Sequence, residues 1–313
     1  MTKIIRIAAL GVPDDYLTSL VPLIIQSMGI QIEWSTVSRA DLVIFGAFFK
    51  FEKPHRWVPK PLRPAFAGLS KRLASKQRPL TLFHTSENQR HDHIPCDYAL
   101  SHDLAVDSTK HCRMPYWMEL VDWHHEGIVG NQNPRFGKLL DLDRLMRPLG
   151  KEFLQKPRRA ALFGSHMREP RHTLLSELSK RIPAQGFGSA FDAKITHHSQ
   201  SSFSKIDVLR EFAFNLCPEN SMYPGYYTEK IPEAFMADCL PLAWADGNVR
   251  CDFNPEAMIN LADMMSDGFE GLAETLLSDI CLSRFSEQAL LLERPSLQRV
   301  QAFVHEVAKT AIT

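Results

Sequence analysis

The stretch that decides the fold is residues 214–244, FNLCPENSMYPGYYTEKIPEAFMADCLPLAW. It opens with a short apolar run, passes through the mostly polar residues 219–230, and closes with a second apolar run. Between these runs, apolar residues recur at helical spacing, at positions 231, 234, 235 and 239. The order strand, polar loop, helix, strand is typical of a βαβ unit and therefore predicts a parallel sheet.

The helix in this stretch has a well-defined start. Pro232 is tolerated only in the first turn of a helix, so the helix should begin near residues 228–230. Glu229 and Lys230 then lie where free backbone N–H groups and the helix dipole favour an anion. A lysine there is unfavourable for an isolated helix, which favours a bound phosphate. The alternative is purely structural, with Thr228 as the helix cap and Glu229 as a partner of the dipole.

Strand and helix signals alternate twice along the chain, which predicts two α/β domains with parallel sheets. Ligands bind such sheets beyond the carboxyl ends of the strands, so the polar ends of TLFHTSEN (81–88) and FNLCPENS (214–221) are the places to seek function. The expected strands are residues 3–12, 31–37, 41–49, 79–88, 97–103, 159–165, 185–188, 214–220 and 239–244. The expected helices are residues 14–28, 64–76, 170–182, 205–212, one from about 228, and most of the chain from about 255.

Composition excludes several classes of protein. The 313 residues carry 36 Lys+Arg and 36 Asp+Glu, so the zero net charge gives no field that would attract nucleic acid or an anionic membrane. No run approaches the roughly 20 apolar residues of a membrane span. Six scattered cysteines without a CxxC pair indicate reduced thiols and a cytoplasmic protein, with the surface of the inner membrane as an alternative location.

The motif within the polar stretch is long and specific enough to suggest a family. E-N-S, then Y-x-T-E-K, with FNLC before it and DFNP (252–255) after it, resembles the α-1,3-fucosyltransferases of glycosyltransferase family 10, in particular bacterial members. TLFHTSEN, CDYALSHD (96–103), RMPYW (113–117) and EPRHTLLSEL (169–178) are similar to further segments of that family. The likeness runs from about residue 80 to 260.

The resemblance implies a GT-B fold, in which two Rossmann-like domains with parallel sheets face each other across a cleft. We expect an acceptor domain at residues 1–157 and a domain that binds GDP-fucose at 158–295. A helix at 296–313 would pack back on the N-terminal domain.

The resemblance also implies roles for individual donor-site residues. Arg171 and Lys230 would neutralise the two phosphates of GDP-fucose, while Asn220 and Tyr226 would hydrogen-bond the nucleotide. Glu229 would contact the fucose and stabilise its positively charged transition state.

On the acceptor side, the resemblance makes Glu87 the general base that takes the proton of the attacking hydroxyl. His84 and Asn88 would line the acceptor site. The implied reaction is an inverting transfer of L-fucose from GDP-fucose to a GlcNAc hydroxyl of a glycan, most simply with an α-1,3 linkage. No cofactor is required, although a divalent cation could stimulate activity.

Two alternatives to this function stay open. One is a transferase of the same fold that uses another GDP-sugar or another acceptor, and the other is a non-catalytic protein that binds a sugar nucleotide.

The chain departs from the family pattern at Ser86 and Ala245, where glycine is usual, and at Pro218, where phenylalanine is common. Pro218 and Ala245 bear on the shape of the donor pocket and therefore on the choice of donor.

We expect no metal site. His84, His91, His93 and Cys96 have a spacing that could be taken for zinc ligands, but the pattern lacks a clear fourth ligand. The D-x-D motif in LLDLDRL (139–145) has neighbours at helical spacing, which favours a solvated helix face.

Overall fold

We describe the protein from a computed structural model, which describes residues 3–49, 78–132, 138–191 and 205–313, except for the side chain of His93. The chain divides into two compact units. The first comprises Met1–Ser101, Val106–Arg113 and Gln298–Thr313, and the second comprises His102–Ala105 and Met114–Leu297.

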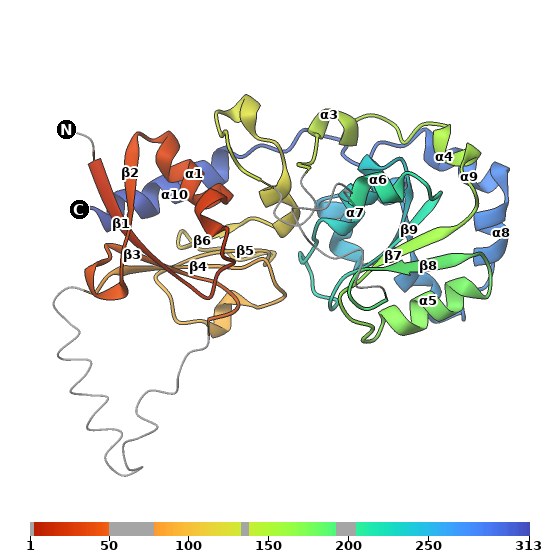
Figure 1. The fold of residues 1–313 in the computed structure, drawn as a ribbon, viewed down its shortest axis with the longest axis horizontal. Helices are drawn as coiled ribbons and strands as arrows, with labels where there is room; N and C mark the ends of the chain where they lie inside the picture. The colour runs from red at the N-terminus through yellow and green to blue at the C-terminus, as the bar shows by residue number, and fades with distance from the viewer. Residues whose placement is uncertain (1–2, 50–77, 133–137, 192–204) are drawn as a thin grey trace, which may run out of the picture. The chain divides into compact units, whose positions relative to one another are not determined.

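The first unit is built on a parallel sheet with the strand order β2-β1-β3-β4-β5-β6 among the described residues (Figure 1). Its helices are α1 (Leu20–Ser27) and α10 (Gln298–Ala311), which contact each other. The strands are β1 (Lys3–Leu10), β2 (Ile30–Trp34), β3 (Leu42–Phe45), β4 (Leu80–His84), β5 (Tyr98–Ser101) and β6 (His111–Arg113). Every residue of β3 is buried, which is why its sequence is an unbroken apolar run.

The second unit holds a parallel sheet with the order β11-β10-β9-β7-β8 in the described part of the chain. Its strands are β7 (Ala160–Phe163), β8 (Ala184–Phe187), β9 (Phe214–Pro218), β10 (Leu240–Trp244) and β11 (Ile259–Asn260). Its helices are α3 (Leu142–Leu145), α4 (Glu152–Gln155), α5 (Arg171–Ser179), α6 (Lys205–Leu209), α7 (Lys230–Met236), α8 (Leu272–Leu277) and α9 (Asp279–Ser286).

The predicted fold class, with two α/β halves on parallel sheets, is confirmed. Residues 114–157, which the sequence assigns to the first domain, are grouped with the second unit. The backbone explains this grouping, because Leu149 donates to the carbonyl of Gln288 and Pro148 forms an isolated bridge with Ala289.

Two expectations about elements were wrong, and one strand was not foreseen. The helix expected at 14–28 is a 3-10 turn at Tyr16–Thr18 followed by α1, since Ser19 adopts an extended backbone between them. The region after 255 is interrupted by β11 and by non-helical residues 289–297. The strand β6 was not foreseen. The helix expected at 64–76 lies outside the described residues.

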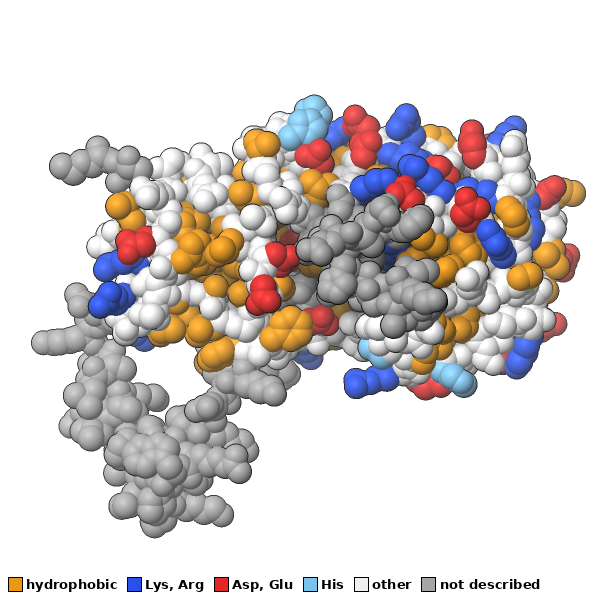
Figure 2. Space-filling view, in the orientation of Figure 1, with side chains coloured by type: hydrophobic (Ala, Val, Ile, Leu, Met, Phe, Trp, Pro, Cys, Tyr) orange, Lys and Arg blue, Asp and Glu red, His pale blue; other side chains and the backbone are white. Residues whose placement is uncertain are grey.

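The surface agrees with the balanced composition. Figure 2 shows acidic and basic side chains mixed along the face where α3, α4 and α9 lie. Arg144 of α3 forms an ion pair with Asp238, at 2.7 Å. Among the described residues, no helix combines the length and apolar character needed to cross a membrane.

A buried ion pair joins α6 to α7. The Lys205 ammonium lies 2.7 Å from a carboxylate oxygen of Glu233, and the two side chains are 3% and 0% exposed. Removing one partner would leave the other charge buried without its counterion, which is far costlier than losing an exposed pair.

We predict that Lys205→Met lowers the free energy of unfolding by about 3–5 kcal/mol, measured by urea denaturation. Lys138→Met is the matched control, because the Lys138–Asp207 pair is 45% and 39% exposed and should be worth about 1 kcal/mol or less. Adding Glu233→Leu to Lys205→Met should recover much of the loss, since an apolar pair can replace a buried ion pair. Equal effects of the two lysine substitutions would contradict this account.

Candidate active site

The polar stretch lies at the carboxyl edge of the second sheet. β9 ends at Pro218 and α7 begins at Lys230, so residues 219–229 form the connection between them. The predicted helix start near residues 228–230 is confirmed. This edge is where ligands bind in parallel α/β sheets.

The buried carboxylate of Glu219 joins the two ends of this connection. It accepts a hydrogen bond from the backbone N–H of Thr228 at 2.8 Å and others from the Thr228 hydroxyl at 2.8 and 3.0 Å. It also accepts one from the Lys230 ammonium at 2.9 Å. Thr228 therefore uses its hydroxyl on Glu219. The alternative in which Thr228 caps α7 does not hold, because the cap position is Glu229, whose side chain makes no capping bond.

Lys230 is held as a cation. Burial lowers the pKa of its ammonium, but the carboxylates of Glu219 and Glu229 raise it by more, so the pKa lies above its ordinary value. Its ammonium also donates to the Thr228 hydroxyl at 2.7 Å, and its side chain is 14% exposed. A charged, oriented and partly accessible ammonium is suited to binding an anion.

Arg171 provides a second cation at this edge. It is the first residue of α5, is buried, and its guanidinium donates to the amide oxygen of Asn220 at 2.5 Å. The same guanidinium lies 2.7–2.8 Å from the ring nitrogens of His166, one of which must accept. The structure thus brings Arg171 and Asn220 together, as the family resemblance implies for a shared ligand.

The pKa of His166 reflects the positive charge around it. Burial lowers the pKa of its imidazole, and Arg171, Arg168 and Lys230 lower it further by repulsion. All three cations therefore lower the pKa of His166, and Arg171 also lowers the pKa of Lys230. An anion bound here would meet this combined positive field.

The other two predicted donor-site residues are buried in the same connection. Tyr226 is buried, and its backbone N–H donates to the carbonyl of Tyr223 at 3.0 Å. Glu229 is buried at the start of α7, directly before Lys230. Arg171, Asn220, Tyr226, Glu229 and Lys230 thus all belong to the second unit.

The predicted acceptor residues belong to the first unit, in the loop that follows β4. The Thr85 hydroxyl accepts from the backbone N–H of Glu87 and donates to its carbonyl, both at 3.1 Å. This local turn fixes the backbone of Glu87, whose side chain is half-buried, as is that of Asn88. His84 is buried, with Nδ1 2.8 Å from the Tyr16 hydroxyl.

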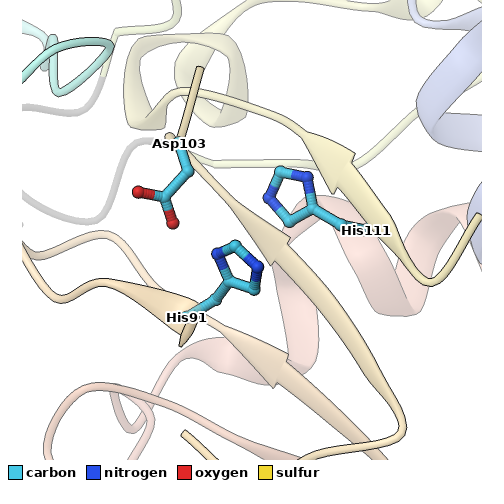
Figure 3. Close-up of side chains that lie close together, drawn as sticks. All are labelled: His91, Asp103 and His111. Atoms are coloured by element: carbon cyan, nitrogen blue, oxygen red, sulfur yellow. The ribbon is translucent and has the colours of Figure 1, made fainter. Parts of the chain in front are cut away.

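His91, one of the residues considered as metal ligands, lies beside a second histidine. The ring of His91 stacks on that of His111, with centroids 4.4 Å apart (Figure 3). His111 also lies 2.9 Å from the Ser101 hydroxyl through Nε2. The side chain of His93 lies outside the described residues. In the D-x-D motif, Asp141 caps α3 by accepting from the N–H groups of Asp143 and Arg144, as expected for a helix and its start.

The sequence analysis missed the partners of Glu219 and any role for His166. Glu219 lies in the polar stretch where a ligand was expected, but its bonds join it to Thr228 and Lys230, nine and eleven positions away. His166 follows β7 at the same edge as Asn220, and a polar residue just after a buried strand was the available signal.

The comparisons agree with this geometry. Residues 153–278 match the family model described as "Glycosyltransferase family 10 (fucosyltransferase) C-term". These residues are similar to the C-terminal part of glycosyltransferase family 10. It is 27% identical over 214 residues to the Alpha-(1,3)-fucosyltransferase FucT of Helicobacter pylori, which is 63% of the chain. It spans less than half of that relative's length, 44%.

Solved structures support the fold over nearly the whole chain. A crystal structure of an alpha1,3-fucosyltransferase matches with a TM-score of 0.67 and 20% identity, covering 99% of the chain and 90% of that structure. One of an alpha1,3-fucosyltransferase with GDP-fucose matches with a TM-score of 0.66 and 18% identity, covering 99% and 92%. The expected GT-B fold class is thus confirmed, and the family resemblance with it.

We predict that His166 titrates below the ordinary histidine pKa of about 6.5 in an NMR titration. Arg168→Ala should raise this pKa because it removes one of the repelling charges. Sulfate, which stays anionic throughout the titration, should raise it also by offsetting Arg171 and Lys230. A His166 pKa that responds to neither change would contradict a cationic site.

Proposed function

We propose that this chain transfers L-fucose from GDP-fucose to a hydroxyl group of GlcNAc in a glycan, with inversion and an α-1,3 linkage. The observation that carries the proposal is the convergence of Arg171 and Lys230 at the carboxyl edge of one parallel sheet, within the residues that match the family model. The H. pylori relative is named as an alpha-(1,3)-fucosyltransferase, and a structure of similar fold is described with GDP-fucose.

Each donor-site residue has a role in this proposal. The Arg171 guanidinium can bind two phosphate oxygens at once, whereas the Lys230 ammonium acts as a point charge. Asn220 and Tyr226 hydrogen-bond the nucleotide or its phosphates. Glu229 contacts the fucose, where its carboxylate stabilises the positive charge that develops on the sugar ring.

The reaction is a direct displacement. The acceptor oxygen forms a bond to C1 of fucose as the bond from C1 to the phosphate oxygen breaks, and the electron pair leaves with GDP. Glu87 takes the proton of the acceptor hydroxyl. Attack opposite the leaving group converts the β-linked donor into an α-linked product. Arg171 and Lys230 stabilise the negative charge on the departing diphosphate without a protein-bound metal.

The remaining features of the proposal concern the acceptor and the setting. His84 and Asn88 flank Glu87 in sequence and line the acceptor site, and a divalent cation that stimulates transfer would act on the diphosphate. We place the reaction in a bacterial cytoplasm, because all six cysteines are free thiols in the structure.

Donor choice depends on two departures from the family pattern. Pro218 is the last residue of β9 and is buried, and it pairs in register with Trp244. Ala245 is buried, and its backbone exchanges hydrogen bonds with the Asn260 side chain at 2.9 and 3.2 Å. Neither departure removes a charged group from the site, so GDP-fucose remains the proposed donor.

The test is a GDP-release assay with N-acetyllactosamine, type-1 disaccharide, chitobiose or no acceptor, and with GDP-mannose as the control donor. We expect release from GDP-fucose that depends on one of the acceptors, and an α-linked product by NMR. Transfer from GDP-mannose alone would contradict the proposed donor. Tight GDP binding without transfer to any acceptor would favour a non-catalytic binding protein.

The role of Glu87 has its own test. Glu87→Gln keeps the size of the side chain but cannot accept the proton, so kcat should fall by about 100- to 10,000-fold. GDP affinity, measured by calorimetry, should stay within a few-fold of wild type because the donor-site residues are unchanged. Glu119→Gln provides the control, since Glu119 lies in the 3-10 helix Tyr116–Leu120 rather than in the loop after β4. Unchanged transfer by Glu87→Gln would remove Glu87 as the base.

A further inference from the structure

The connection between β9 and α7 contains a tight turn at residues 223–226. The backbone N–H of Tyr226 donates to the carbonyl of Tyr223 at 3.0 Å, with Pro224 and Gly225 at the two central positions. Gly225 has a φ of +90°. Proline followed by a residue of positive φ is the signature of a type II turn, which requires glycine at the second central position. This turn fixes where Tyr223 and Tyr226 lie.

The rings of both tyrosines contact one histidine, His102. Its ring lies edge-on to Tyr223, with centroids 5.5 Å apart and an interplanar angle of 80°. It meets Tyr226 at 5.0 Å and 65°. Edge-to-face pairs of this kind add attraction beyond the burial of their area. Since His102 and Tyr226 are both buried, the contact holds the turn from one side.

The backbones of the two segments are also in close contact. A Cβ added at Gly225 would lie 2.3 Å from the carbonyl oxygen of His102 and 2.9 Å from Cγ of Leu104. Ala105, at the end of the His102–Ala105 segment, has a φ of +57°. Such a conformation is unfavourable for a residue with a side chain and persists where the surroundings impose it. The segment is thus shaped to fit the turn.

We infer that His102 and Gly225 are positioning residues for the sugar-nucleotide site, and that the His102–Ala105 segment is the support on which the donor loop rests. The inference rests on the proposed function and extends it to residues beyond the five proposed to bind the donor. Tyr226 follows Gly225 directly, and Glu229 and Lys230 follow within five residues, so the turn sets the direction in which the donor-site side chains leave it.

A residue that serves only stability would give a different result from a positioning residue. Loss of general stability lowers the amount of folded enzyme and leaves the kinetic constants of the folded fraction unchanged. A displaced donor loop weakens donor binding in the folded enzyme, so KM for GDP-fucose and the Kd for GDP rise.

The experiment compares His102→Ala, His102→Phe and Gly225→Ala with wild type. Each variant is assayed for GDP binding by calorimetry, for KM and kcat with GDP-fucose, and for its melting temperature. We expect His102→Ala and Gly225→Ala to weaken GDP binding about tenfold or more. His102→Phe keeps an aromatic edge against both tyrosines and should bind GDP within about twofold of wild type. The kcat of His102→Ala at saturating donor should change little.

Lys230→Ala separates failure of this inference from failure of the proposed function. If Lys230→Ala loses GDP affinity while His102→Ala and Gly225→Ala bind as wild type, the donor site stands and the supporting role of His102–Ala105 is wrong. A loss in His102→Ala that is confined to kcat, or that His102→Phe does not restore, also overturns the role. If Lys230→Ala binds GDP as wild type, the donor site itself is wrong and this inference falls with it.

Discussion

The carboxylate of Glu219 is the group on which the architecture of the second unit's site depends. A buried carboxylate is costly unless donors surround it, and here the donors come from Thr228 and Lys230 at the far end of the connection. Because Glu219 follows β9 directly and bonds to residues at the start of α7, it holds the end of β9 and the start of α7 together. The intervening residues 220–227 must then leave the sheet edge as a closed loop.

This arrangement fixes the charges before any ligand arrives. Lys230 is held by Glu219 and Thr228, and Arg171 is held by Asn220 and His166. Preorganised charges stabilise a developing negative charge without the cost of reorienting at the moment of reaction. α7 itself is short, and the buried pair between Lys205 and Glu233 fixes it to α6 one turn after Lys230. Residues 219–230 are therefore polar for two reasons: some hold the loop in place, and others provide the charged groups of the site.

Long apolar runs made most of the sheet predictable from sequence. The strands β1, β3, β7, β9 and β10 coincide with such runs, whereas β6 and β11 span three and two residues and leave too weak a pattern to detect. The start of α7 was predictable because Pro232 allows only the first turn. The start of α1 was not, because the acidic residues before it lead into a 3-10 turn instead.

The site, like the fold, was only partly predictable from the sequence. Arg171, Asn220 and Lys230 could be named from their family motif, and the structure places them at one sheet edge. The bonds of Glu219, the contact of His166 with Arg171 and the packing of His102 on Tyr226 depend on residues brought together by tertiary structure. A threonine before a helix is often its cap, which was the alternative for Thr228, but its hydroxyl bonds to a buried carboxylate nearby.

The most direct test of the central claim is a crystal structure of the chain with GDP bound. The account predicts the diphosphate at the carboxyl edge of the second sheet, with its oxygens within about 3 Å of the Arg171 guanidinium and the Lys230 ammonium. Glu219 should keep its bonds to Thr228 in that complex. A diphosphate bound away from both cations, or a GDP that leaves residues 219–230 without contact, would contradict the account.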